Sequence, residues 1–170
     1  MSKRVIYVDL SEEGIDYALK ELEKFKKDFI TACNELIKQL TALGIDTAQS
    51  VLTFTTNGWT GDLEKSIYQY DKKWDAENRI GRVHAETPYA AYVEFGTGIK
   101  GAEGEQSEFP HPGYVPDGQG RGEDGWLYYN KREGWRHWTW GEPAKPYMYA
   151  AYARVRDNAG RYTATIFSKL

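Results

Sequence analysis

An apolar stripe of unusual length is the feature that most limits the folds open to this chain. Because an α-helix has 3.6 residues per turn, apolar residues that recur at steps of four and three lie on one of its faces. Nine residues follow this rule without a break: Ile15, Leu19, Leu22, Phe25, Phe29, Cys33, Leu36, Leu40 and Leu43. We predict one amphipathic helix along this stripe, entered at the capping signal Ser11-Glu12-Glu13.

This helix would be long for the chain that contains it. From Ile15 to Leu43 it would extend ~40 Å at about 1.5 Å per residue, and a domain of 170 residues rarely covers so long a stripe by itself. We therefore expect part of the stripe to contact a partner subunit. Cys33 lies within the stripe and is expected to be a buried structural thiol. Gly44 could kink the helix, and Asp46 to Phe54 fits either more helix or a strand.

Short strands and one short helix are expected around the middle of the chain. Val5 to Leu10 has the composition of a strand, and the alternation in Ile67 to Trp74, with Arg79 to Ala85 as its partner, predicts a hairpin through residues 75–78. Residues 89–95 should form a helix, since a proline precedes them and a glycine follows.

The last third of the chain predicts an aromatic hairpin and a final helix. Trp126 to Tyr129 and Trp135 to Trp140 flank a charged loop, as the strands of a hairpin would, and they are expected to join the sheet. After Pro146, apolar residues again recur at steps of four and three, up to Ile166, and predict a helix that Gly160 weakens without ending.

Size indicates one domain, residues 1–170. Residues 96–125 hold nine glycines and three prolines without periodicity, so we expect a long glycine-rich loop inserted in that domain. No apolar run approaches the ~18 residues of a bilayer span, so no membrane partner is expected.

Charge and motif patterns exclude several classes of function. A net charge of -3 argues against a dedicated nucleic-acid binder, which needs a basic surface. The G-x-G-x-x-G match at Gly96 to Gly101 follows a predicted helix instead of opening one, which is the reverse of a dinucleotide site. His84, His111 and His137 are too scattered for a helical metal pair. We predict no catalytic residue, no metal and no cofactor, and hence a protein that is not an enzyme.

Aromatic side chains, 15% of the chain, are concentrated in the second hairpin. Strand alternation places rings on both faces of it, although a monomer needs only one apolar face. The surplus fits a subunit interface, a sheet covered on one side by helices, or a sugar-stacking platform.

Three sequence elements resemble a known family when they are taken in order. They are TGDLEKSI at residues 60–67, YAAYVEFGTG at residues 89–98, and GEPAKPYMYAA at residues 141–151. Together they resemble the tail-completion, or head-tail joining, proteins of long-tailed bacteriophages and prophages, over roughly residues 10–168. The chain departs from shorter members in the insertion after Gly98 and in its tryptophan-rich hairpin.

The resemblance implies a fold of the α+β class, in which a long N-terminal helix and a C-terminal helix pack on a mostly antiparallel sheet. It also implies a structural protein of the phage neck. Its subunits would form a ring, probably a hexamer, that joins the tail tube to the head-closure proteins and lets DNA pass without sequence-specific binding. Such a protein is assembled in the bacterial host cytoplasm and ends up in the virion. A tail terminator that caps the tail tube is the alternative within this class, and a glycan-binding module is the alternative outside it.

We expect the contacts with neighbouring subunits or partners at the turn after the short helix, in the aromatic hairpin and at the start of the last helix. The predicted interface residues are Glu94, Phe95, Gly96, Thr97, Gly98, Trp126, Tyr128, Trp135, Trp138, Trp140, Pro146 and Tyr147.

Overall fold

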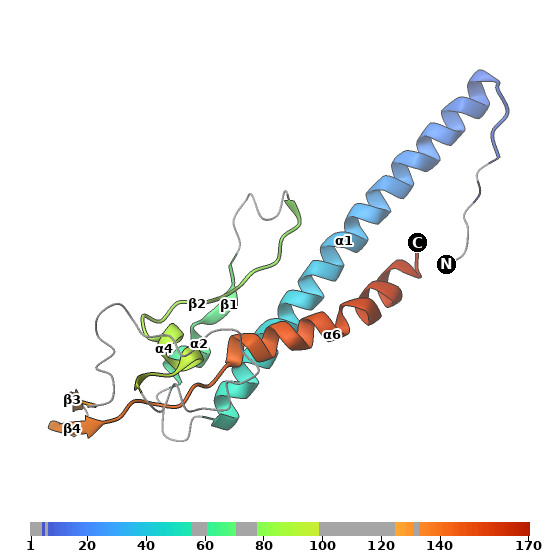
Figure 1. The fold of residues 1–170 in the computed structure, drawn as a ribbon. Helices are drawn as coiled ribbons and strands as arrows, with labels where there is room; N and C mark the ends of the chain where they lie inside the picture. The colour runs from blue at the N-terminus through green and yellow to red at the C-terminus, as the bar shows by residue number, and fades with distance from the viewer. Residues whose placement is uncertain (1–4, 6, 56–60, 71–77, 99–124, 131–132) are drawn as a thin grey trace. The chain divides into compact units, whose positions relative to one another are not determined.

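A computed structural model of the chain describes residues 5, 7–55, 61–70, 78–98, 125–130 and 133–170. The fold is α+β (Figure 1), with a long helix near the N-terminus, a second long helix at the C-terminus and short antiparallel strands between them. Its elements are α1 (Glu12–Thr55), α2 (Asp62–Lys65), β1 (Ile67–Gln69), β2 (Val83–Ala85), α4 (Ala90–Phe95), β3 (Trp126–Asn130), β4 (Trp135–Thr139) and α6 (Tyr147–Phe167).

The predicted long helix is confirmed as α1, and it is longer than the stripe required. Ser11 caps it as expected, because its Oγ accepts a hydrogen bond from the Gly14 N–H at 3.1 Å. The helix passes Gly44 and includes residues 46–54, which settles the ambiguity of that segment in favour of helix. The strand expected at Val5 to Leu10 is wrong for its described residues, which have no regular structure.

Gly44 and Gly81 allow a close approach between α1 and the segment that leads into β2. A Cβ on Gly44 would lie 3.1 Å from Cγ2 of Val83. A Cβ on Gly81 would overlap Oγ1 of Thr41 and would lie 3.0 Å from Cγ2 of Ile37. Gly44 therefore allows Val83 to pack closely on α1, and the helix continues through the position where a kink was considered.

The strands pair within two separate two-stranded sheets in the described part of the chain. In the first, Tyr70 N–H donates to the Arg82 carbonyl at 3.0 Å and Glu86 N–H to the Ser66 carbonyl at 3.4 Å, as in an antiparallel ladder. The connecting hairpin at residues 75–77 lies outside the described residues. In the second sheet, β3 and β4 are antiparallel, as predicted, but they do not join the first.

The chain divides into two compact units, each built from segments that are distant in sequence. The first unit comprises residues 1–45, 69–83 and 152–170, and the second comprises residues 46–68 and 84–151. In the first, the rings of Phe29 and Phe167 meet edge to face with centroids 5.4 Å apart. The core of the second is formed by Ala48, Leu52, Leu63, Ile67, Val93, Tyr147 and Ala151.

The last predicted helix is confirmed as α6, which runs through Gly160. A Cβ at Gly160 would meet no heavy atom within 4 Å. Because alanine is better than glycine in a helix interior by about 1 kcal/mol, we expect Gly160→Ala to raise the free energy of unfolding by about that amount. Urea denaturation followed by circular dichroism would measure it, and a destabilised variant would contradict it.

Candidate functional site

A buried carboxylate joins α4 to the start of α6 in the second unit. Glu94 lies one residue from the end of α4 and only 8% of it is exposed. Its Oε2 accepts the Met148 N–H at 2.8 Å and its Oε1 accepts the Tyr149 N–H at 3.0 Å. These N–H groups belong to the first turn of α6, which has no earlier carbonyl to bond them. Glu94 is therefore the cap of α6, supplied from another helix.

Burial and hydrogen bonding act on the ionisation of Glu94 in opposite directions. Burial penalises the charged form and raises the pKa of Glu94, while the N–H bonds of Met148 and Tyr149 favour the charged form and lower it. The effect of burial is the larger, so the pKa lies above its ordinary value.

Tyr147 fills the space beside this carboxylate. It is 1% exposed, and its hydroxyl donates a hydrogen bond to the Ala90 carbonyl at 3.3 Å. Burial, together with the negative charge of Glu94, raises the pKa of Tyr147. Lys145 N–H donates to the Val93 carbonyl at 2.8 Å and fixes the chain that leads into α6. The phenol therefore anchors α6 on α4.

The turn after α4 is tied to the turn before α6. Thr97 N–H donates to the Glu142 carbonyl at 2.9 Å, and Glu142 N–H is shared between the Thr97 carbonyl at 3.2 Å and the Thr97 Oγ1 at 3.0 Å. Gly96 and Gly98 both have positive φ angles, of 70° and 60°, which lets the chain turn here. Gly141 packs directly on this turn, since a Cβ there would lie 2.9 Å from Cα of Gly98 and would overlap the Thr97 carbonyl.

The first of the three sequence elements contributes to the same unit. Leu63 and Ile67 are buried, and Gly61 enters α2 with a left-handed φ of 74°. Gln49 of α1 donates from Nε2 to the carbonyls of Glu64 at 3.2 Å and Ile67 at 3.4 Å. Sequence reasoning missed Gln49, because nothing in its neighbourhood distinguishes it from a solvent-exposed helix residue.

The predicted interface residues thus separate into two groups. Glu94 and Tyr147 are buried within the subunit, and Gly96, Thr97 and Gly98 form its internal turn. Pro146, which is half-buried, starts α6 by accepting the Ala150 N–H at 3.0 Å. The residues available to a partner are the aromatic ones, namely Phe95, Trp135, Trp138 and Trp140, which are 36%, 73%, 53% and 46% exposed.

The aromatic hairpin presents part of its surface to solvent. Cross-strand register pairs Leu127 with Trp138, and Leu127 is 55% exposed. The rings of Trp138 and Trp140 meet edge to face at 6.0 Å, with their planes 77° apart. Trp126 and Tyr128 belong to β3, but their side chains are outside the described part of the structure. An apolar face therefore extends over Leu127, Trp138 and Trp140.

The polar side chains of the hairpin form a smaller cluster. His137 Nε2 lies 2.7 Å from Glu133 Oε2 in a half-exposed pair. The other two histidines do not join it. The rings of His84 and Tyr68 meet edge to face with centroids 5.6 Å apart, and His111 lies outside the described residues. Among the described residues, no three His, Cys, Asp or Glu side chains gather as they would around a metal.

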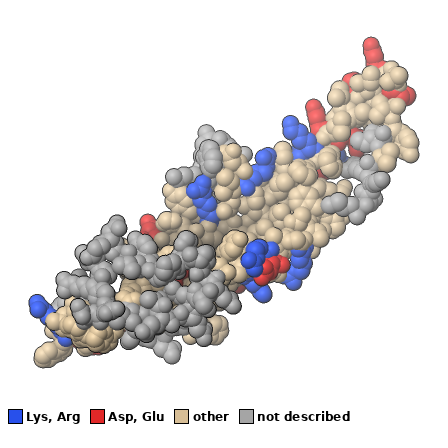
Figure 2. Space-filling view, viewed as in Figure 1, with Lys and Arg blue, Asp and Glu red and all other residues tan. Residues whose placement is uncertain are grey.

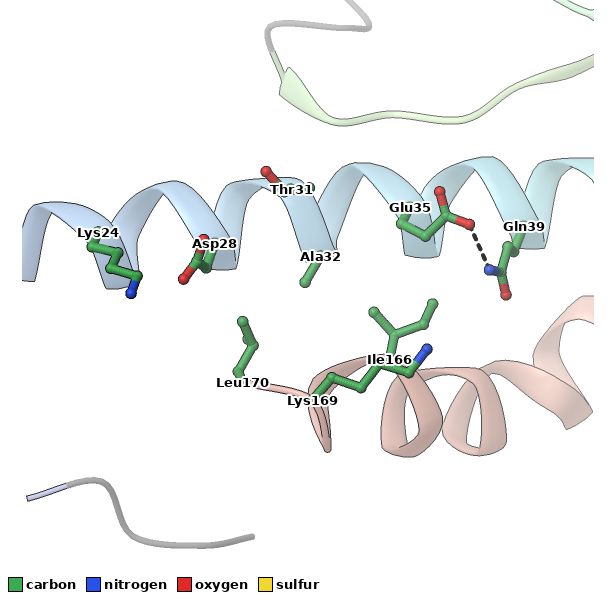
Figure 3. Close-up of a pocket in the computed structure, with 9 residues that line it drawn as sticks. All are labelled: Lys24, Asp28, Thr31, Ala32, Glu35, Gln39, Ile166, Lys169 and Leu170. Carbon is green, nitrogen blue, oxygen red and sulfur yellow. Dashed lines mark hydrogen bonds between the residues drawn. The ribbon is translucent and has the colours of Figure 1, made fainter.

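An open groove of about 520 Å³ lies between α1 and the C-terminal turns of α6 in the first unit. Figure 3 shows charged side chains at its rim, with Lys24 and Asp28 on α1 and Lys169 beyond α6, and Ala32 and Ile166 at its floor. Glu35 is engaged by Gln39, whose Nε2 donates to it at 2.6 Å. The charges are of both signs and face solvent, which is typical of a surface furrow between two helices.

No protein-family model, curated protein or solved structure matches this chain. Among the residues that the structure describes, no helix combines the length and apolar character that a bilayer span requires. Function is therefore argued from the geometry above together with the sequence resemblance.

Proposed function

We propose that this chain is a non-enzymatic structural subunit of the neck of a long-tailed phage. In this role its copies form a ring, probably a hexamer, between the tail tube and the head-closure proteins, and DNA passes through it. The observation that carries the proposal is apolar surface that the described residues leave exposed, on the hairpin β3–β4 and on the N-terminal half of α1. Exposed apolar patches of this kind are typical of subunit and partner contacts.

The placement of the three sequence elements supports the same proposal. Residues 60–67, 89–98 and 141–151 supply the buried side chains, capping carboxylate and glycine turns of one compact unit. The three elements therefore hold residues that fix the packing of the fold, and such residues are the ones that distant members of a family are expected to share. The net charge of -3 also suits a channel along which DNA slides, because it provides no excess of basic groups to hold phosphates.

The proposal is tested by the assembly state of the purified protein. Alone it should be monomeric or weakly associated, and with its tail-tube protein it should form rings visible by negative-stain electron microscopy and light scattering. Trp138→Ala with Trp140→Ala should abolish rings, whereas Phe54→Ala, which removes an 86% exposed ring elsewhere, should not. A monomer that persists with the tail-tube protein would contradict the neck role. Binding to the tube end without the head-closure protein would favour the tail terminator.

The glycan-binding alternative is supported by the exposure of Trp135, Trp138 and Trp140. The planes of Trp138 and Trp140 are 77° apart, however, so the two rings do not form one flat platform for a sugar chain. This geometry favours a protein partner. Sugar-dependent quenching of tryptophan fluorescence across a glycan panel would reverse that preference.

A further inference from the structure

The N-terminal turns of α1 carry an apolar face that no other element of the described first unit covers. Ile15, Leu19 and Leu22 are 45%, 54% and 54% exposed, respectively. Farther along the same stripe, Phe29 meets Phe167 at the end of α6 and Cys33 is half-buried, and Ala32 beside Cys33 is buried. In Figure 1 the first turns of α1 accordingly extend beyond the C-terminal end of α6.

The spacing of this face is that of helices that pair lengthwise. From Ile15 to Leu43 the nine apolar positions recur on average every 3.5 residues, the repeat of a coiled coil. In the described part of the first unit, the later part of the stripe lies beside α6. The earlier part, residues 12–28, has the sequence of a paired helix and reaches the end of α6 at Lys24 and Asp28, which line the groove. We name this segment the α1 arm.

Charge is unevenly distributed along the α1 arm. Its first two turns hold only acids, at Glu12, Glu13 and Asp16. Its later turns hold three lysines, at 24, 26 and 27, among the acids Glu21, Glu23 and Asp28, and Lys20 lies between the two ends. None of the three acids of the first two turns and the three lysines of the later turns forms an ion pair with another described residue. Figure 2 shows the acidic side chains gathered at the end of the helix and the basic ones following them.

We infer that the α1 arm binds the α1 arm of a second copy of this chain, with the two helices antiparallel. In that orientation Leu19 of each copy faces Leu22 of the other, and the acidic turns of each copy lie beside the lysines of its partner. A parallel pair would instead place acids beside acids and lysines beside lysines, which is unfavourable. Charge therefore selects a second copy in the antiparallel orientation as the occupant of the apolar face.

This pairing uses the N-terminal half of α1, which is also part of the apolar surface that supports the proposed phage role, but it is tested separately from that role. An antiparallel pair has two-fold symmetry, whereas neighbours in a cyclic ring are related head to tail. In the free protein the antiparallel pair would cover the apolar face of the α1 arm. The pair would have to dissociate before the subunits form a ring. A dimer without rings would contradict the neck proposal and leave the α1 arm pairing supported. Rings without a dimer would contradict the α1 arm pairing and leave the neck proposal supported.

Sedimentation equilibrium of the whole chain should show a reversible dimer, with a dissociation constant on the order of 10 μM because the contact is small. Leu19→Ser with Leu22→Ser should raise that constant at least about tenfold, since it removes four leucines from the paired surface. Phe54→Ser is the matched control, because Phe54 is 86% exposed near the C-terminal end of α1 and its loss should leave the dimer unchanged. A wild-type monomer at about 1 mM, or equal effects of the two changes, would overturn the inference.

Charge reversal and disulfide trapping test the orientation. Lys24→Glu, Lys26→Glu and Lys27→Glu together should abolish the dimer, because Lys20 is then the one base left in the arm and acids face acids along the rest of the pair. In a Cys33→Ala background, Leu19→Cys should cross-link to Leu22→Cys of a second copy. Ile15→Cys should not cross-link to itself, because the two positions would lie ~16 Å apart along the antiparallel pair, beyond the reach of a disulfide. Efficient cross-linking of Ile15→Cys to itself would establish a parallel pair and overturn the antiparallel one.

Discussion

Replacing Gly141 by alanine is expected to lower the free energy of unfolding by about 3 kcal/mol or more. The φ angle of Gly141 is 105°, a conformation that residues with a Cβ rarely adopt. Its Cβ would overlap the carbonyl of Thr97, which also accepts the Glu142 N–H. The turn between the hairpin and α6 would have to separate from the turn after α4, and both backbone bonds between Thr97 and Glu142 would be strained. Urea denaturation followed by tryptophan fluorescence measures the loss.

Gly134 provides the matched control for this change. Its φ is 73°, so alanine would again meet an unfavourable backbone conformation, but a Cβ there would have no heavy atom within 4 Å. We expect Gly134→Ala to cost only about 1–2 kcal/mol, the intrinsic cost of a left-handed conformation. Equal losses for the two variants would show that the contact between Gly141 and Thr97 contributes nothing to stability.

Glu94→Ala is expected to lower the free energy of unfolding by about 2–3 kcal/mol at neutral pH. The change removes the acceptor of the Met148 and Tyr149 N–H groups at the start of α6 and leaves a space beside buried Tyr147. Glu86→Ala, at an exposed glutamate of the same unit, should change stability by no more than about 0.5 kcal/mol. Thermal and urea unfolding would measure both variants. A loss at Glu94 no greater than that at Glu86 would contradict the capping role.

The pH dependence of the same site follows from the raised pKa of Glu94. A carboxyl group whose pKa is higher in the folded than in the unfolded protein stabilises the fold most below its unfolded pKa, here about 4.5, and this contribution is lost as pH rises through the folded value. The stability of the wild type relative to Glu94→Gln, which does not titrate, should therefore fall as the pH rises above about 4.5. A difference that grows with pH would mean that the two N–H bonds outweigh the cost of burial.

Helices and the aromatic hairpin could be predicted because their signals are local. The steps of four and three in α1 and α6, the Ser11 cap, the exit at Gly96 and the alternation in β3 and β4 all depend on neighbours within a few residues. The strand at residues 5–10 was predicted wrongly because an apolar tetrapeptide has strand propensity but needs a partner strand to form one. The extent of pairing was also overestimated, since two separate sheets replaced one.

The roles of the residues at the candidate site could not be predicted from local sequence signals. Sequence alone placed Glu94, Phe95 and Tyr147 in one functional group, because all three stand in the elements that carry the resemblance. Only the tertiary structure separates them, by bringing Glu94 to the N–H groups of α6 and burying the Tyr147 ring, while Phe95 stays exposed. A glutamate that caps a distant helix and a glutamate that contacts a neighbouring subunit have the same sequence signature.

The sequence by itself determined that this chain has a helix too long for its own fold, because the apolar periodicity of α1 can be recognised within one continuous segment. Only the tertiary structure decided which part of that helix is covered, because coverage depends on where α6 ends. The packing of Phe167 on Phe29 marks that point, and the apolar turns before it remain exposed. The physical reason is that periodicity is a property of one segment, whereas burial is a property of two segments that meet in space.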